Sequence, residues 1–196
     1  CIQGMGVALA DWCIKEGIPY YITLHDAWWI CGRQFMLDRT GAYCNQKVID
    51  LSVCAGCVED PVLNVIRQKK LKGVLDHAQQ LLAPSEFFAE FYRNNGFAGD
   101  HVIVNKNGVM RPRSTTARIR QSGPVRFGYV GGHSRVKGFH LVEKVFRSMG
   151  KEVQLKVVDN MLSLGLSSYD NVALTRQTNV KIIPAYSQDN IDDFFS

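Results

Sequence analysis

The chain has 196 residues, of which 46% are hydrophobic and 21% are charged, and its formal net charge at pH 7 is +5. This composition is typical of a folded globular protein and excludes a disordered or fibrous chain. The small positive charge fits an anionic partner, such as a phosphate-bearing ligand or a membrane surface, but it is too weak to indicate nucleic-acid binding by itself.

The first part of the chain predicts helices that alternate with strands. An irregular insertion at 26–60, rich in Cys, Gly and Asp, interrupts this alternation. Apolar residues then recur at helical spacing from Pro61 to His77, and we expect these to face inward: Val62, Val65, Ile66, Leu71, Val74 and Leu75. The other expected elements are a helix from Gly4 to Lys15, a buried strand from Pro19 to Leu24, a strand at 80–84, a helix that Ser85 caps and Gly96 ends, and a strand at 101–105.

The composition changes at 111–124, where four arginines and two prolines stand among few apolar residues, as in a linker. Helices and strands alternate again beyond it. We expect strands at 125–130, 155–159 and 180–184 and a helix at 137–149 that turns Leu141, Val142, Val145, Phe146 and Met149 inward. This pattern predicts two parallel-sheet α/β domains, at 1–110 and 125–196.

Both ends of the chain predict a piece of a longer protein. Residue 1 is Cys, and an amphipathic helical pattern that Ser187 could cap stops at Ser196.

The six cysteines are unevenly spaced, and a chain of this size needs no disulfides to be stable, so we expect a reducing, cytoplasmic compartment. No apolar run approaches the ~20 residues that a membrane span requires.

One helix carries a run of cations, Arg67, Lys69, Lys70 and Lys72, on the side opposite its apolar residues. Such a run permits peripheral contact with the inner face of a membrane. A solvated helix face is the simpler interpretation.

Ligands of parallel α/β sheets bind at the carboxyl ends of the strands, so the segment "YVGGHSRVKG" is a candidate site. Gly131 and Gly132 allow a tight turn, while Arg135, Lys137 and the start of the helix at Lys137 offer donors to phosphate. An ordinary strand-to-helix turn with two solvated cations explains the same residues.

His25 also follows a strand, and it could serve as a ligand contact, a general base or a metal ligand. Asp26 could orient its imidazole or cap the next turn. Trp28 and Trp29 have the large amphipathic rings that line sugar and base sites, although packing in the core explains them equally.

The insertion contains four cysteines, Cys31, Cys44, Cys54 and Cys57, spaced C-x12-C-x9-C-x2-C. The final C-x2-C with an internal glycine is half of a zinc site, and a structural zinc would staple the insertion. Four unrelated reduced thiols, or a disulfide, remain as alternatives. Cys1 and Cys13 are interpreted as ordinary buried thiols.

Four segments in this order resemble the retaining glycosyltransferases of family 4, also called glycosyl transferase group 1: "GIPYYITLHDAWWIC", "LLAPSEFFAEFYRNNGF", "VIVNKNGV" and "VRFGYVGGHSRVKGFHLVEKVF". The resemblance covers nearly the whole chain. It implies the GT-B fold, in which two Rossmann-like domains face a cleft. A cysteine-bearing insertion after the His-Asp pair occurs in a subset of these enzymes.

The resemblance implies roles position by position. His25 would contact the donor sugar near the reacting centre, with Asp26, Trp28 and Trp29 shaping the acceptor pocket. Gly131, Lys137 and Gly138 match the motif that binds the donor diphosphate. Gly132 stands where the family has an arginine, so Lys137 becomes the main phosphate cation and Arg135 its candidate substitute.

The implied activity is hexosyl transfer with retention from a UDP- or GDP-linked sugar to a carbohydrate or lipid-linked acceptor, in cell-surface polysaccharide or glycoconjugate biosynthesis. The resemblance implies no catalytic metal, so zinc here would be structural. It places the family's two-glutamate motif beyond Ser196 and its glycine loop before Cys1, and we therefore expect the isolated chain to be inactive.

Three other functions stay open. A sugar-nucleotide epimerase of the same architecture would turn over the nucleotide sugar without an acceptor. A degenerate, non-catalytic scaffold would explain the glycine at position 132. A zinc-stapled module that binds nucleic acid is disfavoured, because the basic residues are dispersed rather than aligned with aromatic side chains.

Overall fold

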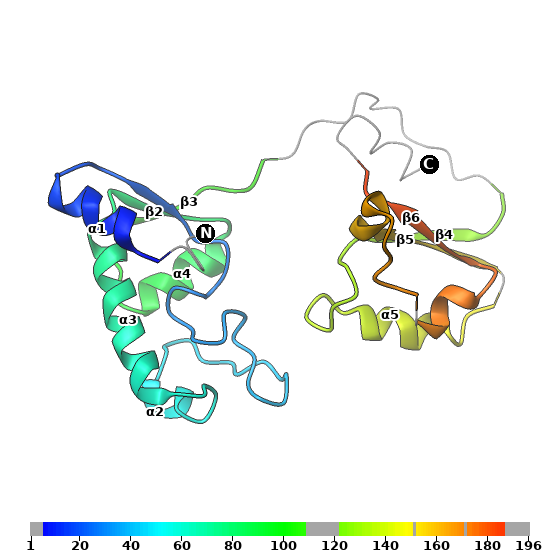
Figure 1. Ribbon diagram of the computed structural model, residues 1–196, viewed down its shortest axis with the longest axis horizontal. Coiled ribbons are helices and arrows are strands. Elements are labelled where there is room, and N and C mark those ends of the chain that lie inside the picture. Colours follow the sequence, from blue (N-terminus) through cyan, green and yellow to red (C-terminus); the bar gives the residue numbers. More distant parts are fainter. Residues whose placement is uncertain (1–5, 109–121, 151, 171, 187–196) are drawn as a thin grey trace. The chain divides into compact units, whose positions relative to one another are not determined.

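The computed structural model describes residues 6–108, 122–150, 152–170 and 172–186. The chain divides into two compact units, Cys1–Gly108 and Val109–Ser196, and each contains a three-stranded parallel sheet (Figure 1). The α/β class with two parallel sheets, predicted from the sequence, is confirmed. Gly4, Cys1, the helix expected after Ser187 and most of the expected linker lie outside the described residues.

The first unit has its sheet in the order β1-β2-β3, with Ile22 opposite Leu81 and Leu82 opposite Ile103. Helix α4 lies along β2 and β3 (Figure 1). The elements are α1 (Ala8–Lys15), β1 (Tyr21–Thr23), α2 (Leu51–Cys54), α3 (Pro61–Asp76), β2 (Gln80–Ala83), α4 (Glu86–Asn94) and β3 (Val102–Val104).

Local hydrogen bonds explain where two of these helices begin. The Asp60 carboxylate accepts from the Leu63 N–H at 2.9 Å, and Pro61 provides a first helical residue that needs no donor. The Ser85 hydroxyl accepts from the Phe88 N–H at 3.3 Å, as expected for the N-cap of α4. Gly96 follows α4 with φ of 91°, in the left-handed region that glycine tolerates.

The stripe of α3 that faces inward differs from the expected one. Leu71, Val74 and Leu75 are buried as predicted, but the prediction is wrong for Val62, Val65 and Ile66, which are 69%, 48% and 58% exposed. The inward stripe continues instead through Asn64, Arg67 and Gln68. Arg67 donates to the carbonyl of Trp28 and Gln68 to that of Ile30, so this half of α3 holds the backbone of the insertion.

The strand predicted as buried from Pro19 to Leu24 is shorter and only half buried. Tyr21 and Thr23 are exposed, whereas Ile22 and Leu24 point into the core. This alternation arises because β1 lies at one edge of the sheet and presents one face to the core.

The second unit has the sheet order β4-β5-β6, and its core contains Phe139, Phe146, Leu155, Tyr169 and Leu174. Its elements are β4 (Val125–Tyr129), α5 (Phe139–Phe146), β5 (Val153–Asp159), two 3-10 helices, η1 (Asn160–Leu164) and η2 (Ala173–Arg176), and β6 (Val180–Pro184). Helices α5 and η2 lie on the same side of this sheet (Figure 1).

Helix α5 begins two residues later than expected and is shorter. Leu141 and Val145, which were predicted to face inward, are 58% and 46% exposed. Val142, Phe146 and Met149 pack on the core as predicted, and Phe139, three residues before Val142, joins them. None of the described helices is both long enough and apolar enough to cross a membrane.

Tyr169 supplies a test of this second core. Its ring is buried, and its hydroxyl has no hydrogen-bond partner among the described residues. Because a buried polar group without a partner costs free energy, Tyr169→Phe is expected to raise the free energy of unfolding by about 1 kcal/mol in urea denaturation. Tyr43→Phe, at an exposed ring, is the matched control. A loss of stability in Tyr169→Phe would contradict the unsatisfied hydroxyl.

The same residue predicts a pH dependence. Burial raises the pKa of Tyr169 from 10.0 to about 12. The folded state therefore keeps the proton at pH values where the unfolded chain loses it, and this contribution to stability is lost as the pH rises from 10 to 12. Tyr169→Phe should show a shallower loss of stability over that interval.

Candidate functional site

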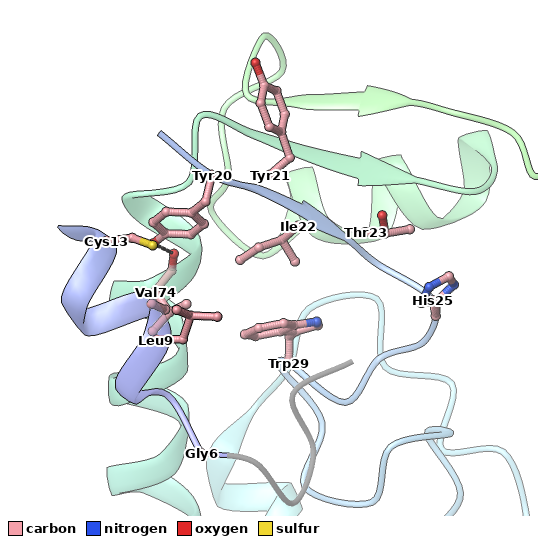
Figure 2. A pocket seen from close by; sticks show the side chains of 11 residues that line it. Gly6, Leu9, Cys13, Tyr20, Tyr21, Ile22, Thr23, His25, Trp29 and Val74 are labelled. Carbon is pink, nitrogen blue, oxygen red and sulfur yellow. Dashed lines mark hydrogen bonds between the residues drawn. The ribbon is translucent and has the colours of Figure 1, made fainter. Parts of the chain in front are cut away.

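A pocket of about 360 Å³ lies between β1 and α1, on the side of β1 that Ile22 faces (Figure 2). Leu9 and Cys13 of α1 lie at one end of it and Thr23 and His25 at the other, with the indole of Trp29 between them. The Tyr20 hydroxyl donates to the carbonyl of Val74 at 2.6 Å and closes the end near α1. The lining is mostly apolar, as in many small-molecule sites.

His25 stands where the strand ends, on backbone that the sheet holds in place. The Leu24 N–H donates to the carbonyl of Leu82 at 2.8 Å, and the Leu24 side chain is fully buried. The imidazole of His25 is exposed and has no hydrogen-bond partner among the described residues. It is therefore available to a ligand of this pocket.

The carboxylate of Asp26 is occupied by its own loop. One oxygen accepts from the Trp28 N–H at 2.8 Å and the other from the Gln34 side-chain amide at 2.7 Å. Of the two roles that the sequence left open, capping the following turn is the one that these contacts describe. The carbonyl of Asp26 accepts from the Tyr92 hydroxyl at 3.0 Å, which ties the turn to α4.

The rings of the two tryptophans pack edge to face with their centres 5.3 Å apart, but they line different pockets. Trp29 is buried beside His25. Trp28 lines a polar hollow of about 620 Å³ together with Arg33 and Arg39. The guanidinium of Arg67 lies 4.6 Å from the centre of the Trp28 ring, and burial lowers the pKa of this arginine. The two tryptophans predicted to shape the acceptor pocket are thus divided between two hollows, and Asp26 lines neither.

Sequence reasoning passed over Arg33 and Arg39. Their hydrogen bonds go to backbone carbonyls, from Arg33 to Leu37 at 2.9 Å and from Arg39 to Val58 at 2.6 Å. The sequence did contain an indication of this polar hollow, because two arginines follow a tryptophan pair inside an insertion with few apolar residues.

The four cysteines of the insertion, Cys31, Cys44, Cys54 and Cys57, line one small pocket, which we call the four-cysteine pocket. All four are free thiols. Burial raises the pKa of Cys54, and a hydrogen bond from Gln46 opposes this rise. As the side chains stand in the described residues, no three His, Cys, Asp or Glu groups are placed to hold a metal ion. Cys13 lies apart, in the His25 pocket.

In the second unit, the glycine-rich turn that follows β4 is tightly folded. A Cβ atom at Gly131 would lie 2.6 Å from the hydroxyl oxygen of Tyr129, so only glycine fits there without movement. That hydroxyl lies 3.1 Å from the carbonyl oxygen of Gly132 and 3.2 Å from that of Lys137, and its donation ties the two ends of the turn together. Gly138, the N-cap of α5, has φ of 81°.

Gly132 has φ of 68°, which is strained for any residue with a side chain. An arginine, which the resemblance leads one to expect here, would not adopt this backbone without cost. The backbone conformation of the turn therefore explains why Gly132 stands where the family has an arginine, since glycine adopts this conformation most easily.

The donors of this turn lie earlier than expected. The N–H groups of Lys137 and Gly138 are used within the turn, by the carbonyls of Ser134 and Arg135. In contrast, no described residue accepts from the N–H groups of Gly131, Gly132 or His133.

The two cations of the turn are also free to bind an anion. The side chains of Arg135 and Lys137 are exposed and have no ion-pair partner among the described residues. His133 was not singled out from the sequence; its ring packs against Phe139 at 5.1 Å and Tyr169 at 5.6 Å. This contact fixes the middle of the turn on the core.

Comparison of the chain with protein-family models, curated proteins and solved structures gave no match.

Proposed function

We propose that this protein is a retaining glycosyltransferase of family 4 with the GT-B fold, which moves a hexosyl group from a UDP- or GDP-linked sugar to a carbohydrate or lipid-linked acceptor. The observation that carries the proposal is the turn at 131–138. Among the described residues its N–H groups at 131–133 have no acceptor and its two cations have no ion-pair partner. The turn stands at the carboxyl end of a parallel strand, where such sheets bind phosphate.

In the proposed reaction, the bond between the anomeric carbon and the leaving diphosphate oxygen breaks, and a bond from the acceptor hydroxyl oxygen forms on the same face. The acceptor proton leaves with the nucleoside diphosphate or to solvent. Negative charge grows on the diphosphate, so fixed donors aimed at it lower the barrier. Lys137 supplies a point charge, and the N–H groups of Gly131 and Gly132 supply dipoles that need no reorganisation.

The first unit would contribute the sugar contacts. His25 lies exposed at the rim of the pocket beside β1, where it can donate a hydrogen bond to a sugar hydroxyl. Trp29 offers an indole surface in the same pocket, suited to the apolar face of a pyranose. The proposed setting is the cytoplasm, with the protein soluble or peripheral at the inner face of a membrane.

Lys137→Ala tests the donor site in the protein expressed from the complete gene. We expect transfer, followed as release of nucleoside diphosphate from a panel of UDP- and GDP-hexoses, to fall at least ~10²-fold, because one charged contact to the leaving group is lost. Lys144→Ala, at an exposed lysine of α5, is the matched control and should retain activity. Equal activity of the two variants would remove Lys137 from the donor site.

The competing functions give different results in the same assay. An epimerase would convert the nucleotide sugar in the absence of any acceptor. A non-catalytic scaffold would release no nucleotide from any donor of the panel. A nucleic-acid module would bind RNA or DNA with an affinity that falls steeply with salt.

A further inference from the structure

We propose that the four-cysteine pocket is a structural site for one zinc ion held by four thiolates. The proposal rests on the insertion alone and does not depend on the proposed function. It concerns a part of the first unit that lies between β1 and α3.

The thiols reach this pocket from separate places in the insertion, each held by a backbone hydrogen bond. The N–H of Cys31 donates to Ala27 at 2.7 Å in the turn after the His-Asp pair. The N–H of Cys44 donates to Met36 at 2.9 Å, beside the bridge that pairs Leu37 with Tyr43. Separate segments of the insertion thus each bring a thiol to the same pocket.

The last two cysteines form a compact pair. The N–H groups of both Cys57 and Val58 donate to the carbonyl of Cys54, at 2.8 and 3.2 Å, and fold the C-x2-C segment into a turn. Such a turn lets two thiolates face the same ion, as in zinc knuckles. It is the half of the site that the spacing already indicated.

The size of the pocket selects the ligand. Its cavity volume is about 10 Å³, which is roughly the room that a single water-sized group needs, so an organic ligand does not fit. Met36, Ile49 and Val58 contribute apolar side chains to its wall. A small space lined by four soft donors favours zinc over magnesium or calcium, which prefer oxygen ligands.

Charge and hydrogen bonding around the pocket suit an anionic metal centre. Four thiols lose one proton each on binding zinc, and the resulting centre carries two negative charges. Arg33 lines the same pocket and supplies an opposite charge. The side-chain amide of Gln46 donates to the sulfur of Cys54 at 3.7 Å, a contact that stabilises a thiolate more than a thiol.

The thiols do not form a closed shell as they stand, so binding requires them to turn toward the centre of the pocket. Binding of the ion would hold the backbone of the insertion in one conformation. Gln34, Met36 and Asn45 all have positive φ, between 55° and 65°, which costs free energy and persists only where other contacts hold the backbone. A zinc ion that joins Cys31 and Cys44 to the C-x2-C turn brackets all three positions.

The first experiment measures the metal content of the protein expressed from the complete gene and purified without added metal. We expect about one zinc ion per chain by elemental analysis. Exchange for Co²⁺ should give the visible bands of a tetrahedral ion and the near-ultraviolet thiolate-to-metal absorption. No bound zinc together with a cobalt spectrum that lacks thiolate bands would overturn the proposal, and so would a disulfide between any two of the four.

Variants locate the ion. The double variant Cys54→Ser, Cys57→Ser should lose the zinc, whereas Cys13→Ser, at a free thiol outside the pocket, should keep it. If the double variant does not fold, labelling of the unaltered protein decides the question. The four thiols should resist a thiol reagent until a chelator is added, and equal labelling with and without chelator contradicts the site. These experiments measure metal binding and not activity. The zinc site can therefore be absent in an active glycosyltransferase, and it can be present in a protein without that activity.

Discussion

Replacing His25 by alanine is expected to lower the proposed glycosyl transfer at least ~10²-fold while the free energy of unfolding changes little. We expect activity to fall without a loss of stability because of the position of His25. Its backbone is fixed by the neighbouring Leu24, which is fully buried and pairs with β2, whereas its imidazole is exposed and has no partner among the described residues. Removing the ring therefore takes away a ligand contact and almost no packing.

The measurement is kcat/KM for the donor identified by the nucleotide-sugar panel, together with urea unfolding of the same preparation. His77→Ala is the matched control, since His77 is also exposed and its Nδ1 lies 2.8 Å from the carbonyl oxygen of Gly73, one turn earlier in α3. His25→Asn should recover part of the activity if the ring serves as a hydrogen-bond donor. Near-normal turnover of His25→Ala would remove this residue from the proposed site.

The parts of the fold that the sequence predicted correctly are those that local chemistry determines. Ser85 and Gly96 bound α4 because a hydroxyl at the first position and a positive φ after the last are requirements of the helix itself. The parallel sheets followed from the alternation of helices and strands, since parallel strands need such crossovers.

The inward stripe of α3 could not be predicted from apolar spacing alone. Either of two faces of this helix could turn toward the core, and the more apolar face includes Val62 and Ile66. The observed stripe runs through Asn64 and Arg67 because this half of α3 packs on the insertion, where Arg67 donates to the Trp28 carbonyl and lies over the Trp28 ring. A polar face that supports an irregular segment has no periodic signature in the sequence.

The candidate site shows the same division. His25 and Gly131 were found because each follows a strand, and the carboxyl ends of strands are where ligands bind. The separation of Trp28 from Trp29 was not predictable, because it depends on Arg67, which lies far along the chain and covers one ring. Convergence of the cysteines was partly predictable, since the C-x2-C spacing indicates a pair but not which other thiols join it.

Tyr92 links the core to the candidate site, and its substitution has the largest expected effect on stability. Its side chain is fully buried and contacts the rings of Phe88, Phe91 and Phe97. Burial raises its pKa, so its hydroxyl stays protonated and donates to the carbonyl of Asp26. Removing the ring opens a cavity at the centre of the first unit and releases the turn that carries His25.

Tyr92→Ala is expected to lower the free energy of unfolding by about 3–5 kcal/mol, the range for loss of a buried aromatic ring. Tyr92→Phe keeps the ring and removes only the hydrogen bond, so it should cost about 1 kcal/mol. Phe87→Ala, at a neighbouring residue of α4 that is 60% exposed, is the matched control and should change stability little. Urea unfolding of the three variants separates packing from hydrogen bonding, because the first contribution appears only in Tyr92→Ala. If Tyr92→Phe were as destabilised as Tyr92→Ala, the hydroxyl and its hold on the Asp26 turn, rather than the ring, would determine the stability of this unit.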